Sequence, residues 1–305
     1  MDRSNPTSWQ LKIERAKEHF GALETEVMAW LKTNPMAMTK EKDAEGRHHT
    51  VFAEIVNPPP LNRWSLISGD CIHNLRSALD SLIYGIAIHE TGLNPPEDEA
   101  KLQFPIFSDA DKFNEKRNKD RIKSLSQAVQ SEIEKVQPYN VPHKELPPLL
   151  ELLGVLDNFD KHRTLNVMAA VPQSANFDMV HSPDRAISSV TGHRKGIEGK
   201  TEILSFTVEP PEQNLEYKCG AAIFICVTHP PGPSKSPFSD LGGILHLLIE
   251  EVENIVGRLE AIVGEMHDIK GVNPNAAAHF KIDKHGVIRS VSNDEGATLR
   301  SPATG

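Results

Sequence analysis

Hydrophobic residues recur at helical spacing in three long stretches of the chain. Residues 8–32, 61–91 and 241–266 each carry apolar residues three or four positions apart, which is the repeat of one helix face. Gly92 follows the second stretch and is suited to end a helix, because glycine readily adopts the left-handed conformation. Asp240 precedes the third stretch and is suited to cap a helix at its start. The pattern therefore predicts three long helices.

The pattern changes between the second and the third of these helices. Pro147 and Pro148 suit a first helical turn, and the apolar run that they open continues through the charged sequence DNFDKHR at 157–163. From residue 164 to about 230, short apolar runs alternate with Pro, Gly, Asn and Asp, which is typical of antiparallel strands joined by turns.

These elements predict an α+β protein with a helical bundle core and an antiparallel β-sheet inserted before a long C-terminal helix. We expect a helical region over 1–163 with a short β segment at about 48–57, and an antiparallel β region over 164–236. The last helix, at 237–267, is expected to pack on the bundle, and the polar residues 268–305 are expected to form a flexible tail. The apolar stripe of the last helix suits either a core position or a dimer interface.

Composition and charge narrow the classes of function. The 305 residues carry a formal net charge of −9, which argues against bulk binding to DNA or to an anionic membrane. The N-terminus lacks the apolar core of a signal peptide, and the apolar run AAIFICV at 221–227 is too short to span a bilayer. We therefore expect a soluble, cytoplasmic protein without membrane association. The sequence also lacks the P-loop, the glycine-rich dinucleotide motif and the esterase elbow.

Neither the cysteines nor the histidines are spaced like metal ligands. Cys71, Cys219 and Cys226 show no CxxC spacing, and the last two fall in one predicted strand, where their odd spacing puts them on opposite faces. The 14 histidines include no HxxxH or HExxH pair, and the adjacent His48 and His49 are expected in a loop. We predict neither a metal ion nor a cofactor.

Two stretches place ionisable residues where the apolar pattern predicts contacts between helices. In GDCIHNLRSALD, at 69–80, His73 and Asp80 fall opposite the apolar face and Arg76 falls to one side. Few other charged residues occur in this part of the helix, so we expect it to be covered on most sides. A covered carboxylate needs a partner, because an unpaired buried charge is strongly destabilising.

The second stretch is the end of the helix that runs through DNFDKHR. Extending the apolar stripe of this helix by one turn places Asp160 and Arg163 inward, with Asn158 and His162 on the opposite side. We therefore predict that the two helices pack together and share a polar network of His73, Arg76, Asp80, Asp160 and Arg163.

The network has two interpretations, and the sequence leaves both open. It is either a salt-bridge lattice that fixes the register of the helices, or a ligand-binding or catalytic cleft, where perturbed titratable groups cluster. In the second interpretation His162 is a general acid or base, and Arg76, Lys161 or Arg163 holds an anion. The predicted catalytic residues are His162, His73, Arg76 and Arg163. The predicted supporting polar residues are Asp80, Asn158, Asp160, Lys161, Asn74 and Tyr84.

Four motifs in the first 170 residues resemble a bacterial protein family. They are RW..ISGD.IHNLRSALDSL, FPIF, QPY and LDNFDKHRTL. This resemblance implies no particular activity. A more remote similarity is to HEPN domains, helical bundles that often act as metal-independent ribonucleases in toxin and phage-defence systems.

The HEPN signature is an arginine, a polar residue, three variable residues and a histidine on one helix. The sequence DNFDKH matches the polar residue and the histidine as Asn158 and His162, but Asp157 stands in place of the arginine. Arg76 or Arg163 would then have to stabilise the developing phosphate charge. The resemblance implies a metal-independent ribonuclease or phosphoester-binding protein of a toxin or defence type, commonly a homodimer, with RNA or another phosphate-containing ligand as its partner.

The alternative is a non-catalytic helical binding or scaffold protein in which the HNLRSALD and DKHR motifs form a structural polar network. The basic stretch KFNEKRNKDRIK, at 112–123, is suited to contact phosphates. Because it also contains Glu115 and Asp120, a solvated helix face is the favoured interpretation.

Overall fold

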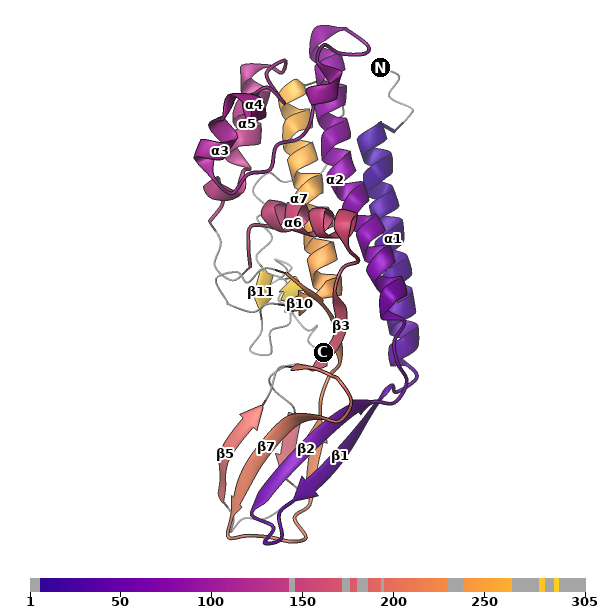
Figure 1. Cartoon of the computed structure of the whole chain (residues 1–305), viewed down its shortest axis with the longest axis vertical. Helices are drawn as coiled ribbons and strands as arrows, with labels where there is room; N and C mark the ends of the chain where they lie inside the picture. The colour runs from indigo at the N-terminus through magenta and orange to yellow at the C-terminus, as the bar shows by residue number, and fades with distance from the viewer. Residues whose placement is uncertain are drawn as a thin grey trace, which may run out of the picture.

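A bundle of helices and a lobe of β-strands follow one another along the long axis of the molecule (Figure 1). This computed structural model describes residues 6–142, 146–171, 176–179, 186–192, 195–229, 238–264, 280–282 and 288–290. The antiparallel sheets and the helical core confirm the predicted α+β class.

Helix α2 (Leu61–Thr91) is the central element of the bundle. It packs against α1 (Ser8–Leu31), α6 (Leu149–His162) and α7 (Leu241–Val263). In Figure 1, α1, α2 and α7 run side by side and α6 crosses them. The largest fully buried side chains of α2 are Trp64, Ile72, Leu75, Leu79, Leu82, Ile83 and Ile86.

Helix α7 is a core helix. The side chains of Leu245, Leu248, Val252 and Ile255 are all buried in the same hydrophobic cluster as α1 and α2. The apolar stripe of the last helix is therefore buried by contacts within the chain. Ile262, near the end of this helix, is 39% exposed.

The helix ends follow local capping rules. Thr7, rather than Ser8, caps α1 and forms a capping box with Gln10. Gly92 ends α2 in the left-handed conformation with φ of 69°, as predicted. Asp240 caps α7, where its carboxylate accepts a hydrogen bond from the backbone N–H of Gly243 at 2.6 Å.

Short elements cover one side of the bundle between α2 and α6. They are the 3₁₀ turns η1 (Glu99–Lys101) and η2 (Pro138–Asn140) and the helices α3 (Ala110–Asn114), α4 (Lys116–Lys119) and α5 (Gln127–Lys135). An extended segment at 102–107 connects η1 to this group and crosses beside α2.

One four-stranded antiparallel sheet forms the far lobe, with strand order β1-β2-β7-β5. The strands are β1 (Met36–Lys42), β2 (His48–Ile55), β5 (Ala186–Gly192) and β7 (Thr201–Glu209). The β region therefore begins well before residue 164. The predicted β segment at about 48–57 corresponds to β2 alone. Strand β1 was not predicted, because this edge strand is mostly exposed and shows no apolar alternation.

A second sheet, of order β10-β9-β3-β6, packs against the bundle. Its strands are β3 (Val167–Val171), β6 (Lys195–Gly196), β9 (Phe224–Thr228) and β10 (Phe238–Asp240). Two further pairs of strands are β4 (Asn176–Met179) with β8 (Tyr217–Gly220) and β11 (Phe280–Ile282) with β12 (Ile288–Ser290). Apart from β11 and β12, the predicted tail at 268–305 lies outside the described residues.

Two local predictions were wrong. Cys219 and Cys226 lie in different strands, β8 and β9, because the apolar run that contains them is interrupted at 221–223. His48 and His49 lie in β2 rather than in a loop, and the buried ring of His49 stacks on Phe206 at a centroid distance of 5.2 Å. None of the described helices is both long and apolar enough to cross a membrane.

Candidate functional site

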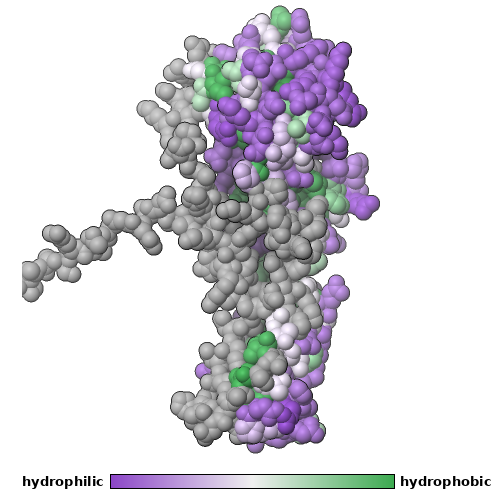
Figure 2. All heavy atoms as spheres, turned by 90° about the vertical axis from the view of Figure 1, so that its left-hand side faces the viewer, coloured by the Kyte–Doolittle hydropathy of each residue, from purple (hydrophilic) through white to green (hydrophobic). Residues whose placement is uncertain are grey.

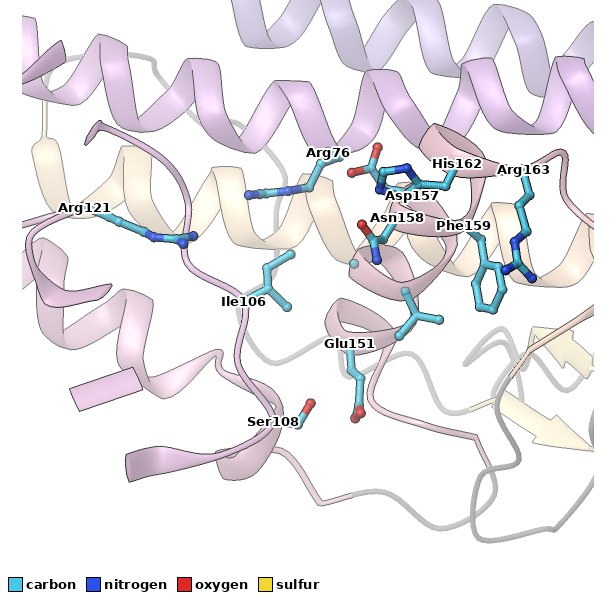
Figure 3. Close-up of a pocket in the computed structure, with 12 residues that line it drawn as sticks. Arg76, Ile106, Ser108, Arg121, Glu151, Asp157, Asn158, Phe159, His162 and Arg163 are labelled. Carbon is cyan, nitrogen blue, oxygen red and sulfur yellow. The ribbon is translucent and has the colours of Figure 1, made fainter. Parts of the chain in front are cut away.

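A cleft of about 790 Å³ lies where α6 faces α2 and the segment that follows η1 (Figure 3). This volume falls within the range that is usual for small-molecule sites. Its polar lining includes Arg76, Arg121, Asp157, Asn158, His162 and Arg163.

The four motifs of the sequence resemblance surround this cleft. HNLRSALD lies on α2 and DNFDKHR on α6 or directly after it, while FPIF forms the extended segment between them. The glutamine of QPY, Gln137, is fully buried and holds the FPIF segment. Its amide donates a hydrogen bond to the carbonyl of Pro105 at 2.9 Å and accepts one from the N–H of Phe107 at 3.0 Å. Motifs up to 90 residues apart thus build one site.

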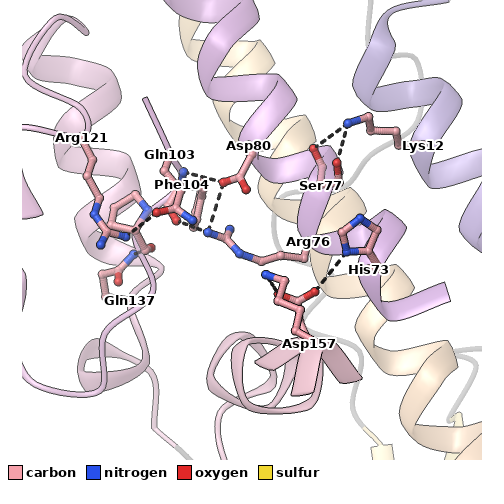
Figure 4. A network of polar contacts seen from close by, with 12 residues as sticks. Lys12, His73, Arg76, Ser77, Asp80, Gln103, Phe104, Arg121, Gln137 and Asp157 are labelled. Atoms are coloured by element: carbon pink, nitrogen blue, oxygen red, sulfur yellow. Dashed lines mark hydrogen bonds and ion pairs between the residues drawn. The ribbon is translucent and has the colours of Figure 1, made fainter. Parts of the chain in front are cut away.

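Arg76 and Asp80 hold the same segment from the side of α2 (Figure 4). Arg76 Nη2 donates to the carbonyl of Phe104 at 2.8 Å, and Asp80 Oδ1 accepts from the N–H of Phe104 at 2.9 Å. Nη2 of Arg76 and Oδ1 of Asp80 are 3.1 Å apart, so these two members of the predicted network form an ion pair.

Burial governs the electrostatics of this pair. Burial lowers the pKa of Arg76, although Asp80 and Asp157 act in the opposite direction. Burial also raises the pKa of Asp80, although the Arg76 guanidinium and the Phe104 N–H stabilise its charged form. An arginine nevertheless stays protonated in proteins, so the pair retains a cation at the wall of the cleft.

The carboxylate of Asp157, on α6, is buried, and Asp157 is not one of the residues of the predicted polar network. Its side chain is 5% exposed, and Oδ2 accepts from Lys161 Nζ at 2.6 Å. Oδ1 lies 3.5 Å from Nδ1 of His73, which is an ion pair only when His73 is protonated. The repeat of Leu150, Leu153 and Asp157, at spacings of three and four, was the signal for this position.

The predicted position of Arg163 was wrong. We placed it on an inward helical stripe, but α6 ends at His162 and Arg163 has extended backbone angles, with φ of −157° and ψ of 156°. Arg163 is therefore exposed, yet it lines the cleft. Asn158 and His162, which we placed away from the network, line the same cleft as Arg76.

Asp160 lies against α2 at Gly69, where an added Cβ would be 2.2 Å from its Oδ1. Its pKa is raised by burial first and then by the nearby carboxylates of Asp70 and Asp157, while His73 lowers it. Asp160 does not line the cleft.

The remaining predicted supporting residues take different places. Lys161 forms the ion pair with Asp157. Asn74 donates to the carbonyl of Asp70 within α2, and the hydroxyl of Tyr84 donates to Glu99 at 3.3 Å. Neither Asn74 nor Tyr84 lines the cleft.

Arg121 and Arg163 line the cleft and form no ion pair with a carboxylate in the part of the chain that the structure describes. Arg121 Nη1 donates to the neutral amide of Gln103 at 2.7 Å. Arg76 and Asp157, by contrast, are paired with Asp80 and Lys161, and Glu151 is the other carboxylate of the lining. The cleft therefore has an excess of positive charge in a chain whose net charge is −9.

Three of the six cations in the basic stretch at 112–123 form ion pairs in the described structure, and they are Arg117, Lys119 and Lys123. Arg117 pairs with Glu115 at 2.8 Å, and Lys123 pairs with Asp98 at 2.7 Å. Figure 2 shows a mostly hydrophilic surface over the part of the molecule where α3 to α5 lie. This agrees with the predicted solvated helix face. Arg121 is an exception, because it lines the cleft.

The described residues contain no group of three or more His, Cys, Asp or Glu side chains arranged to hold a metal ion. Comparison of the chain with known protein families, with curated proteins and with solved structures finds no match. The geometry and charge of the cleft are therefore the basis for a functional proposal.

Proposed function

We propose that the cleft between α2 and α6 binds a phosphate ester that extends over more than one anionic group. The observation that carries this proposal is the position of the two arginines that have no carboxylate partner among the described residues. Arg121 and Arg163 lie at opposite ends of the cleft, with Arg76 between them (Figure 3).

Arginine suits this task because its planar guanidinium donates two parallel hydrogen bonds to phosphate oxygens. A single phosphate does not need cations at both ends of a cleft, whereas a ligand with successive phosphates does. Phe159 and Ile106 also line the cleft and supply apolar surface for the rest of such a ligand. A short single-stranded RNA is the ligand that fits this combination of arginines and an exposed aromatic ring.

The test is fluorescence anisotropy with a labelled RNA pentanucleotide. We expect Arg121→Ala and Arg163→Ala each to weaken binding about tenfold, because charge-assisted hydrogen bonds contribute about 1.5–3 kcal/mol. Two neutralised phosphates should give a log–log salt slope of about −1.4. Arg117→Ala is the matched control, since Arg117 is an exposed arginine paired with Glu115. Equal weakening by all three substitutions, or no binding by the wild type, would refute the proposal.

A metal-independent ribonuclease is the second candidate function. The observation that favours it is that Asn158 and His162, the residues matching the HEPN signature, both line the cleft with Arg76 and Arg163. The 2′-oxygen then bonds to phosphorus as the bond from phosphorus to the 5′-oxygen breaks. The proton of the 2′-hydroxyl passes to water, and His162 is the general acid that protonates the leaving 5′-oxygen. The missing signature arginine is replaced by Arg76 or Arg163.

Cleavage of RNA in the presence of EDTA tests this candidate. His162→Ala should abolish cleavage and leave RNA binding within twofold, and the products should end in 2′,3′-cyclic phosphate. Binding without any cleavage by the wild type would favour the non-catalytic alternative, a binding module. The HEPN resemblance also implies a homodimer, and sedimentation velocity measures the oligomeric state.

A further inference from the structure

Two buried polar atoms at the cleft lack hydrogen-bond partners among the described residues. They are Nη1 of Arg76, a donor, and Oδ1 of Asp157, an acceptor. Arg76 is 7% exposed and Asp157 is 3% exposed, and both line the cleft. The 3.5 Å from Asp157 Oδ1 to His73 Nδ1 is longer than a well-formed hydrogen bond. Unsatisfied buried polar atoms are costly, so a donor and an acceptor left open together indicate groups that a ligand completes.

The charges of Arg76 and Asp157 restrict which ligand groups can bind to their open atoms. Asp80 already balances Arg76, and Lys161 already balances Asp157. A second cation at Asp157 would leave an uncompensated positive charge, whereas a neutral donor would not. The open acceptor therefore suits a neutral hydroxyl group, and the open donor suits an oxygen acceptor. If that oxygen belongs to a phosphate, the negative charge of the phosphate is balanced by Arg121 and Arg163, which supply the excess positive charge of the cleft.

We infer that Asp157 is a specificity-determining residue whose Oδ1 accepts a hydrogen bond from a hydroxyl group next to the phosphate that Arg76 contacts. This inference rests on the proposed function and narrows the ligand to a ribonucleotide with a 2′-hydroxyl beside a 3′-phosphate. The HEPN resemblance does not imply it, because Asp157 stands where that signature has an arginine.

Isothermal titration calorimetry with three small probes tests the inference on the wild-type protein. The probes are uridine 3′-monophosphate, its 2′-deoxy counterpart and orthophosphate. We expect the ribonucleotide to bind about tenfold more tightly than the deoxynucleotide, because a hydrogen bond to a charged group contributes about 1.5–3 kcal/mol. Asp157→Ala should reduce this ratio to about one while both nucleotides still bind.

Glu132→Ala is the matched control, since Glu132 is also a buried carboxylate with cationic partners, Lys135 and Arg258, and does not line the cleft. It should leave the tenfold ratio unchanged. Equal affinity of the wild type for both nucleotides would overturn the inference and leave the proposed function standing. Failure of all three probes and of RNA to bind would instead overturn the proposed function. If Asp157→Ala does not fold, equal affinity of the wild type for the two nucleotides still overturns the inference.

Discussion

At the scale of single residues, the polar groups between α2 and α6 divide into a satisfied part and an unsatisfied part. Asp80 accepts from Phe104 and lies 3.1 Å from Arg76, so it fastens the wall of the cleft. Asp157 Oδ1 has no hydrogen-bond partner among the described residues. The structural interpretation of the charged motifs therefore applies to Arg76 and Asp80, whereas the functional proposal concerns Asp157.

Asp80→Ala should lower the free energy of unfolding by about 2 kcal/mol. The substitution leaves Arg76 buried without its carboxylate and frees the N–H of Phe104. Breaking a fully buried pair costs about 3–5 kcal/mol, but Asp80 is one-third exposed, which reduces the effect. Urea denaturation measures this change.

Glu18→Ala is the control for this substitution, because Glu18 forms an exposed ion pair with Arg15 and should change stability by less than about 0.5 kcal/mol. If the two substitutions have equal effects, Asp80 does not fasten the segment.

At the scale of the elements, the close contact between α1 and α2 depends on one glycine. A Cβ at Gly85 would lie 2.4 Å from Cζ3 of Trp9, whose ring is buried in the core. The indole N–H of Trp9 also donates to Glu260 of α7 at 2.8 Å. Trp9 thus joins three helices and has little freedom to move away.

Gly85→Ala and Gly21→Ala should change stability in opposite directions. Both glycines are inside helices, where alanine is intrinsically favoured by about 1 kcal/mol. At Gly21 nothing lies within 4 Å of the added Cβ, so alanine should stabilise by about 0.5–1 kcal/mol. At Gly85 the clash with Trp9 should outweigh the propensity and destabilise by about 1–3 kcal/mol. Urea unfolding of both variants tests this, and stabilisation of both would show that α1 and α2 can separate.

At the scale of the whole molecule, the described residues form two hydrophobic cores. One joins the helices to β3 and β9, and the other lies in the far lobe around Val51, Leu204, Phe206 and Tyr217. The described residues that line the cleft belong to α2, to α6 and to the segments between or beside them. Damage to the far lobe should therefore leave the cleft intact.

Phe206→Ala should destabilise the far lobe by about 3–5 kcal/mol, because Phe206 is 2% exposed and packs against His49 and Tyr217. Hydrogen exchange measured by mass spectrometry should become faster in β1, β2 and β7, while RNA binding at the cleft stays within twofold. Loss of RNA binding in this variant would show that the lobe supports the cleft.

Much of the helical architecture could be predicted from the chain itself, because its determinants are local. The bounds of α2, its left-handed end at Gly92 and the Asp240 cap of α7 depend on neighbours within one or two turns. Strand β1 could not be predicted, since its polar edge is stabilised by pairing with β2 rather than by its own pattern.

The candidate site likewise has a part that the sequence predicts and a part that depends on the tertiary structure. The sequence by itself determined which two helices carry the ionisable residues and that Arg76 and Asp80 lie one helical turn apart, within reach of each other. Only the tertiary structure decided that Asp157 is buried, that Arg163 leaves the helix, and that Arg121 joins them from another segment. The physical reason is that the spacing of residues along a helix shows which of them share a face. Whether that face is buried, where the helix ends and which distant segments contact it depend on what packs against it in the folded protein.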